Sequence, residues 1–252
     1  GDWENLGPFF IPDGKGYRGL GRLNAIAFHP TDPEIIYAGA PAGGLWITQD
    51  GGSTWISYCD DLPTLGVSSI AVDYSNPDII YMGTGDRDAG DASGIGVLKS
   101  TDGGMTWNTA NTGIENLTIG RMIIHPVDPN TLYLASTGGI YKTTDAGASW
   151  TQQMNGNFKE IVFKTDDPQS LFASKGGDFY KTTDGGNNWI KTTSGLVSAT
   201  RGVIAVTPAN TEVVYFLTTT SNEFKALYRS TDAGNSFTEM SNSPNIMSWG
   251  CD

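Results

Sequence analysis

Three aspartates stand close together in one glycine-rich stretch of the sequence. Asp86, Asp88 and Asp91 lie within residues 85–94, which read Gly-Asp-Arg-Asp-Ala-Gly-Asp-Ala-Ser-Gly. Carboxylate oxygens at this spacing suit a hard cation such as Ca²⁺, and they could equally supply the carboxylate pair of a glycosidase. The match to an EF-hand loop is poor, because Val97 stands at the twelfth position. The stretch is a candidate Ca²⁺ site, and the alternative is a solvated loop without a ligand.

Three arginines form a second candidate site, this one for an anion. Arg22, Arg121 and Arg201 each stand next to a glycine where an apolar run of the sequence begins. Guanidinium groups bind carboxylates and other anions bidentately, so three that converge could hold an acidic ligand. The alternative is that each arginine pairs with a carboxylate of a neighbouring structural unit.

Five copies of one motif indicate the structural units that hold these candidate residues in place. The pattern Ser/Thr-x-Asp-x-Gly-x-x-Trp/Phe recurs roughly 40–50 residues apart, which is the length of one propeller blade. The carboxylate can accept backbone N–H groups in its own turn, and the glycine can take a positive φ. We therefore expect the five aspartates to be structural, namely Asp50, Asp102, Asp145, Asp184 and Asp232.

A second repeat precedes each motif and supplies the other strands. Each copy has an apolar run, a proline turn and a second apolar run that contains an aromatic residue; the prolines are Pro33, Pro77, Pro129, Pro168 and Pro208. These patterns predict four strands per unit and no helix. The fold class is all-β, a β-propeller of five visible blades over residues 21–240. We expect residues 1–20 to pack on the propeller and residues 241–252 to approach a further blade, so that the chain is part of a larger propeller.

The repeated motif resembles the Asp-box, or BNR repeat. That repeat occurs in sialidases, xyloglucan-cleaving glycoside hydrolases, sortilin-type receptors, a photosystem assembly factor and large secreted proteins of Bacteroidetes. Residues 39–46 and 83–86 are most similar to the last group, whose members resemble cargo of type IX secretion. By resemblance to sialidases, the three arginines would surround a substrate carboxylate. The chain lacks the Phe/Tyr-Arg-Ile-Pro segment that marks the first blade of those enzymes.

The composition restricts the classes of partner and the cellular compartments that are compatible with the sequence. The formal net charge is −12, which disfavours nucleic acid and anionic membrane surfaces as partners. No run of about 20 apolar residues is present, so the sequence predicts no membrane span. Cys59 and Cys251 are the two cysteines; they could form a disulfide in an oxidising compartment or remain thiols. We expect an extracellular or cell-surface location.

These features favour a binding or interaction module whose partner is a glycan or a surface or secretion-system protein. No complete catalytic signature is visible, and Ca²⁺ is the one cofactor that the residues suggest. Two alternatives stay open. The first is a glycoside hydrolase of the sialidase-like or xyloglucanase-like type, which needs two carboxylates facing each other across a cleft. The second is a structural adhesin or scaffold.

Overall fold

The computed structural model describes residues 22–221 and 223–243. These residues form five antiparallel sheets of four strands each, and each sheet is made from consecutive strands. The predicted segment 1–20 and residues 244–252 of the predicted approach segment lie outside the described residues. The strands, blade by blade, are β1 (Ala25–Phe28), β2 (Ile36–Ala40), β3 (Gly44–Thr48) and β4 (Ile56–Ser57); β5 (Val67–Val72), β6 (Ile80–Thr84), β7 (Val97–Ser100) and β8 (Asn108–Thr109); β9 (Ile119–Ile124), β10 (Leu132–Ser136), β11 (Gly139–Thr143) and β12 (Thr151–Asn155); β13 (Glu160–Lys164), β14 (Asp167–Lys175), β15 (Asp178–Thr182) and β16 (Ile190–Thr192); and β17 (Arg201–Val206), β18 (Val214–Thr220), β19 (Glu223–Ser230) and β20 (Thr238–Ser241).

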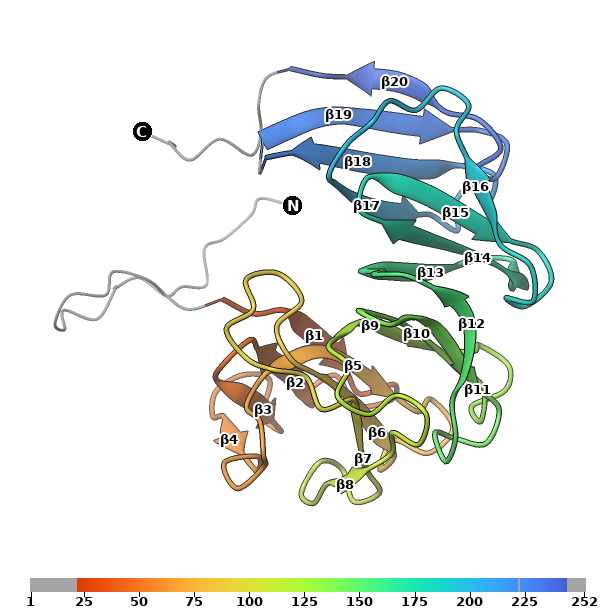
Figure 1. Cartoon of the computed structure of the whole chain (residues 1–252). Coiled ribbons are helices and arrows are strands. Elements are labelled where there is room, and N and C mark those ends of the chain that lie inside the picture. Colours follow the sequence, from red (N-terminus) through yellow and green to blue (C-terminus); the bar gives the residue numbers. More distant parts are fainter. Residues whose placement is uncertain (1–21, 222, 244–252) are drawn as a thin grey trace, which may run out of the picture.

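The blades are arranged side by side around a common centre. The first strands β1, β5, β9, β13 and β17 lie innermost and contact one another in that order. Figure 1 shows that the five blades make an open arc, with blade 1 (β1–β4) and blade 5 (β17–β20) at its two ends. The all-β propeller predicted from the repeats is therefore confirmed, as part of a larger propeller ring.

The hydrophobic core lies between blades. Each of four clusters joins two neighbours; the cluster between blades 2 and 3, for example, includes Tyr81, Val97, Ile119 and Leu134, all almost fully buried. Burying one such side chain stabilises the fold by about 1.5–3 kcal/mol. Blades 2, 3 and 4 are each covered on both faces by neighbouring blades, and their strands are therefore nearly continuous apolar runs in the sequence.

The five repeat turns join the third and fourth strand of each blade. In blade 2, the Ser100 hydroxyl donates to Asp102 Oδ1 at 2.7 Å, and the Thr106 N–H donates to the same oxygen at 2.8 Å. The Thr106 hydroxyl donates to Asp102 Oδ2 at 2.6 Å. In blade 4, Asn188 replaces the usual Ser or Thr and makes the same two bonds to Asp184. Each aspartate is thus fully engaged within its own turn.

A candidate site at the inner rim

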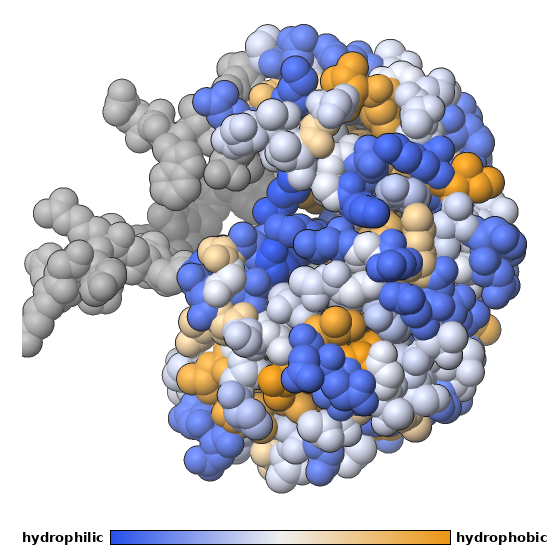
Figure 2. Space-filling view, viewed as in Figure 1, coloured by the Kyte–Doolittle hydropathy of each residue, from blue (hydrophilic) through white to orange (hydrophobic). Residues whose placement is uncertain are grey.

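One end of every blade faces the inner rim of the arc, where first strands begin and the loops between second and third strands lie. The repeat turns lie at the opposite end of the blades. Hydrophilic side chains line the inner side of the arc (Figure 2). We call the charged residues gathered there the rim cluster; they are Arg22, Asp86, Arg87, Asp88, Asp91, Arg121, Lys159, Glu160 and Arg201.

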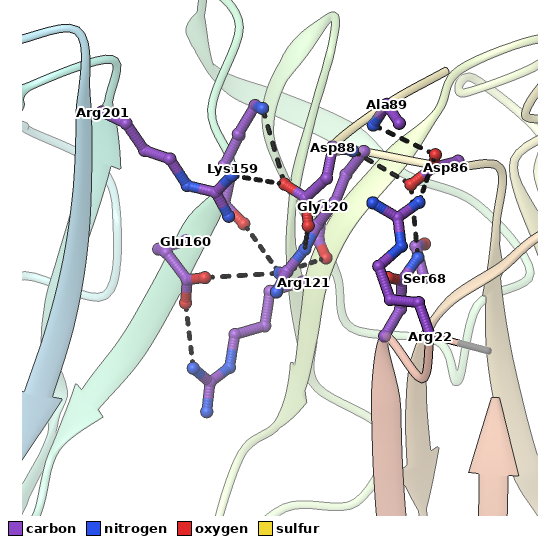
Figure 3. Close-up of polar contacts among 12 residues, drawn as sticks. Arg22, Ser68, Asp86, Asp88, Ala89, Gly120, Arg121, Lys159, Glu160 and Arg201 are labelled. Carbon is purple, nitrogen blue, oxygen red and sulfur yellow. Dashed lines mark hydrogen bonds and ion pairs between the residues drawn. The ribbon is translucent and has the colours of Figure 1, made fainter. Parts of the chain in front are cut away.

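The loop between β6 and β7 organises the rim cluster, and Asp86 organises that loop. The buried Asp86 carboxylate accepts the backbone N–H groups of Asp88, Ala89 and Asp91 at 3.0–3.1 Å. Arg22 of blade 1 donates to Asp86 Oδ2 at 2.6 Å. The same Arg22 nitrogen also lies 3.5 Å from Oδ2 of Asp91. One carboxylate therefore shapes its own loop and ties blade 2 to blade 1 (Figure 3).

The electrostatics keep Asp86 ionised. Burial raises the pKa of the Asp86 carboxyl, but the N–H groups of Asp88 and Asp91 and the Arg22 guanidinium outweigh burial and hold the pKa far below its usual range. All of these donors require the charged form. Asp86 consequently acts as a fixed anion that holds structure.

The next two residues of the loop reach across the arc. The Arg87 guanidinium donates to the carbonyl oxygen of Gly120 in blade 3 at 2.8 Å, and it lies 3.3 Å from Glu160 in blade 4. Asp88 Oδ1 lies 2.8 Å from Arg201 in blade 5. Residues of one loop in blade 2 thus contact all four other blades, since Asp86 already contacts blade 1.

Glu160 is the second buried carboxylate of the cluster. Its side chain is 4% exposed and sits between two cations, Arg87 at 3.3 Å and Arg121 at 2.9 Å. Asp88 has a comparable position: burial raises the pKa of its carboxyl, while the charges of Arg201 and Arg87 lower it, and the net shift is downward. The rim cluster therefore alternates acids and bases, and each buried charge is paired (Figure 3).

Glycines allow the loop to cross so closely over its neighbours. Gly85 has φ = 97°, a backbone conformation that favours glycine. A Cβ on Gly94 would lie 2.3 Å from the carbonyl oxygen of Leu117 in the connection to blade 3. Any side chain at Gly94 would push the loop away from that connection.

The three aspartates of the calcium prediction do not converge on one point. Asp86 and Asp88 turn to arginines of different blades, and Asp91 is largely exposed. Within the described residues, no group of three or more acidic, histidine or cysteine side chains is positioned to hold a metal ion. The contacts to arginines account for the positions of the Asp86 and Asp88 carboxylates without a metal ion. Ca²⁺ binding stays a prediction that this arrangement does not support.

The three arginines of the anion prediction lie on the same rim, but each has a carboxylate partner from another blade. Arg22 pairs with Asp86, Arg121 with Glu160, and Arg201 with Asp88. Arg22 and Arg121 pair with the neighbouring blade, as in the alternative that sequence analysis left open, whereas Arg201 of blade 5 reaches a carboxylate of blade 2. All three guanidinium groups keep one partly exposed side, so binding of an external anion stays a prediction.

Sequence analysis missed three members of the cluster: Arg87, Lys159 and Glu160. One signal was available, because Glu160 in β13 occupies the register position of Arg121 in β9. Glu160 pairs with Ser174 and Arg121 with Ala135, each two residues ahead of the residue opposite the second strand's aromatic. Opposite charges at equivalent positions of adjacent blades predict an ion pair. No sequence pattern indicated how far Arg87 reaches.

The predicted disulfide cannot be located, since Cys251 lies outside the described residues. Cys59 is a buried thiol that accepts the Leu45 N–H at 3.0 Å. Its pairing with Cys251 stays a prediction.

Two polar hollows open at the rim. One, of about 320 Å³, lies between the first strands of blades 1 to 3 and is lined by Asn24, Ser68, Ser69 and Arg121, with isoleucines behind them. The other, of about 80 Å³, lies beside the loop; its lining residues are Asp86, Arg87, Thr118, Gly120, Thr137, Asn157, Phe158 and Lys159. Hydroxyl, amide and charged groups dominate the larger hollow, and the smaller one presents polar and apolar groups together, so the larger suits a polar ligand and the smaller a ligand with both kinds of group. The described residues contain no helix with the length and apolarity needed to cross a membrane.

Comparisons with known proteins identify relatives of this chain. No family model matches it. Xyloglucanase Xgh74A of Acetivibrio thermocellus is 29% identical over 165 residues, covering 60% of this chain and 19% of that enzyme. A xyloglucanase of Hypocrea jecorina is 30% identical over 157 residues, covering 56% and 17%, and one of a Paenibacillus species is 28% identical over 149 residues, covering 53% and 14%. The chain spans less than a fifth of the length of these relatives.

Solved structures agree on the fold. An ancestral GH74 enzyme superposes with a TM-score of 0.69 at 23% identity, covering 89% of this chain and 34% of that one. YCF48 bound to D1 peptide gives 0.56 at 16% identity, covering 87% and 80%, and a chain of the nidogen/laminin complex gives 0.61 at 12% identity, covering 87% and 78%. The chain is a β-propeller whose homologues include GH74 xyloglucanases.

Proposed function

We propose that this chain is the polysaccharide-binding part of an extracellular glycoside hydrolase that acts on xyloglucan or a chemically similar polysaccharide. The observation that carries the proposal is the 28–30% identity to xyloglucanases over 53–60% of the chain. A polymeric substrate of this kind is too large to enter a cell, which is why we place the protein outside it. This proposal replaces an interaction module as the leading interpretation.

The rim is the surface that we propose for the polysaccharide. It is the hydrophilic inner side of the arc, and both polar hollows open there. Sugar hydroxyls are recognised by hydrogen bonds to hydroxyl, amide and charged groups, each contributing about 0.5–1.5 kcal/mol net. Thr137 and Asn157 are exposed at the smaller hollow and are free of the ion-pair network.

Hydrolysis also requires a carboxyl group that is protonated when it meets the glycosidic oxygen. Asp86 and Asp88 have lowered pKa values and ion-pair partners, and Glu160 lies between two arginines. These three carboxylates are suited to organising the rim. In our proposal the proton donor is therefore a residue other than these three.

The first experiment measures xyloglucan binding and sugar release by the full chain. Affinity gel electrophoresis with xyloglucan in the gel reports binding, and a reducing-end assay reports cleavage. We expect Thr137→Ala combined with Asn157→Ala to weaken binding about tenfold, as two lost hydrogen bonds would. The matched control combines Thr144→Ala with Asn108→Ala, two exposed positions at the opposite end of the blades. Migration unaffected by xyloglucan, together with no released sugar, would sink the proposal.

Binding without cleavage is the second candidate function. It is favoured by the pairing of the buried rim carboxylates with cations. Retarded migration with no reducing ends over a long incubation would select it, and released sugar would select the hydrolase.

A further inference from the structure

Two arginines of different blades line the larger rim hollow, the one of about 320 Å³ between the first strands of blades 1 to 3. Arg87 comes from the loop between β6 and β7, and Arg121 comes from β9. None of the described residues that line this hollow is acidic. The smaller hollow differs, because Asp86 lies in its wall together with Arg87 and Lys159. The larger hollow is therefore distinguished by positive charge without a carboxylate in its wall.

Glu160 holds these two arginines close to each other. Its buried carboxylate lies 3.3 Å from Arg87 through Oε1 and 2.9 Å from Arg121 through Oε2 (Figure 3), and it is not part of the lining of the hollow. Two guanidinium groups repel each other, so a shared carboxylate is needed to keep them together. The pair is thus in place before a ligand arrives, and preorganised donors lose little freedom on binding.

Both guanidinium groups keep hydrogen-bond donors that the described residues do not use. A guanidinium group has five N–H donors. Among the described residues, Arg87 donates through Nη1 alone, to the carbonyl oxygens of Gly120 and Lys159. Arg121 likewise donates through Nη1 alone, to Glu160, and its side chain is 43% exposed. The remaining N–H groups suit a carboxylate, because guanidinium groups bind carboxylate oxygens bidentately.

The rest of the wall fits a sugar ring better than a bare anion. Ser69 is buried, and its hydroxyl oxygen accepts the Met122 N–H at 2.9 Å, which leaves the hydroxyl hydrogen without an acceptor among the described residues. The Asn24 amide oxygen also has no hydrogen-bond partner among them. One isoleucine from each of β1, β5 and β9 adds apolar surface. The volume is at the lower end of the range of about 300–1,000 Å³ for small-molecule sites, which suits a single sugar residue.

The charge of the whole chain restricts the kind of anion. The rim cluster contains five cationic and four anionic side chains, whereas the formal net charge of the chain is −12. The cluster is thus a positive patch on an acidic protein, and the acidic remainder repels a polyanion. A carboxylate carried singly by a neutral polysaccharide escapes most of that repulsion, because charges beyond about 8–10 Å are largely screened.

We propose that the larger hollow binds a uronic acid residue of the polysaccharide, whose carboxylate contacts Arg87 and Arg121. Hydroxyl groups of the same sugar contact Ser69 and Asn24. This inference rests on the proposed function, since it names an acidic substituent of the polysaccharide that the rim binds. It differs from the three-arginine prediction, because Arg121 is the one member of that set that lines this hollow.

An NMR titration of the isotope-labelled full chain with methyl glucuronide and methyl glucoside tests the hollow. The two sugars differ only at C6, which is a carboxylate in the first and a hydroxymethyl group in the second. We expect the glucuronide to bind more tightly by about tenfold or more, as charge-assisted hydrogen bonds would provide. Acetate, a carboxylate without a ring, should bind about tenfold more weakly than the glucuronide, because it cannot use the rest of the wall.

Two glutamine variants separate the hollow from the general charge of the rim. Arg121→Gln removes the exposed guanidinium group of the hollow, and we expect it to weaken glucuronide binding about tenfold while glucoside binding is unchanged. Arg201→Gln is the matched control, because it removes the same charge from a rim arginine of similar exposure, 36% against 43%, outside the hollow. Arg121→Lys keeps the charge but not the planar fork, so it should recover only part of the affinity. Thermal melts check that each variant is folded.

Several outcomes would overturn the proposal. Equal affinities for the glucuronide and the glucoside, acetate that binds as well as the glucuronide, or no detectable binding of the glucuronide would each do so. An equal loss in the two glutamine variants would assign the effect to the charge of the rim. Failure of the proposed function is read separately. Xyloglucan that retards the chain, with no preference for the glucuronide, removes the acidic site alone, whereas a glucuronide preference that depends on Arg121, without xyloglucan binding or cleavage, removes the proposed function alone.

Discussion

The rim cluster and the repeat turns use the same chemistry at opposite ends of the blades. In each, an aspartate carboxylate accepts backbone N–H groups and side-chain donors, as Asp86 and Asp102 both do. In the turns every donor comes from within four residues of the aspartate. In the rim cluster the side-chain donors come from distant blades, as Arg22 does for Asp86 and Arg201 for Asp88.

That difference separates two kinds of stability. A turn bond fixes local geometry, and the sequence repeats the geometry five times. A rim bond is made once and joins blades whose order in space must already be set. We therefore expect a lost turn bond to loosen one hairpin, and a lost rim bond to loosen the arc.

Acid is the broadest way to test the comparison, because it titrates both regions at once. Hydrogen bonds from Thr106, Ser149, Asn188 and Ser236 lower the pKa values of Asp102, Asp145, Asp184 and Asp232 to about 2. Since folding lowers these pKa values from 3.8, their stabilisation is present above that pH and is lost as pH falls toward about 2. We expect the melting temperature to be level near pH 6 and to fall steeply below about pH 4.

Thermal melts at a series of pH values check this, with Asp86→Asn as the comparison variant. That variant should have a lower melting temperature at neutral pH and keep most of its fall in acid, because all five repeat turns, whose aspartates have lowered pKa values, are intact. A variant curve without the slope would mean that the rim, and not the turns, governs acid unfolding.

Glu160→Ala is the largest single-site effect we expect. It leaves Arg87 and Arg121 without their shared carboxylate, and removing one partner of a buried ion pair costs about 3–5 kcal/mol. Urea unfolding measures the loss, and Glu160→Gln, which keeps the shape, should lose less. Asp232→Ala in the turn of blade 5 is the partner experiment. A loss there as large as that of Glu160→Ala would contradict the distinction between local and arc-wide bonds.

Gly186→Ala and Gly90→Ala compare a turn with the rim loop at matched backbone strain. Both glycines have positive φ, at 89° and 79°. A Cβ on Gly186 meets the Tyr133 ring at 3.3 Å, whereas a Cβ on Gly90 meets nothing within 4 Å. Gly90→Ala should cost about 1 kcal/mol from strain alone, and Gly186→Ala about 1 kcal/mol more. Equal losses in urea unfolding would remove the blade contact as a reason for the turn glycine.

The same contrast explains what the sequence could predict. Local, repeated features such as the Asp102 turn follow from residue types a few positions apart, so the blades, their strand order and the all-β class were predictable. Arg22, Arg121 and Arg201 were found because each stands next to a glycine where an apolar run begins. Their partners were not, because an ion pair such as Arg201–Asp88 depends on how far one loop reaches across the arc. Loop 85–94 has no counterpart in the other blades, and only its close packing shows where it goes.

The smallest effect we expect is a gain in stability inside one turn. Ala146 follows its repeat aspartate with φ = 55°, a left-handed conformation, whereas the equivalent residue of blade 4 is Gly185 with φ = 68°. Ala146→Gly relieves strain of about 1–2 kcal/mol but adds flexibility to the unfolded chain, so we expect a net gain of about 0.5–1 kcal/mol. Gly185→Ala should shift urea unfolding the other way. Ala148→Gly, in the same turn but with ordinary φ, is the control and should not stabilise. If Ala146→Gly lowers the stability, the alanine methyl contributes packing that outweighs its backbone strain. Even the repeated turns would then differ according to the neighbouring blade that each one contacts.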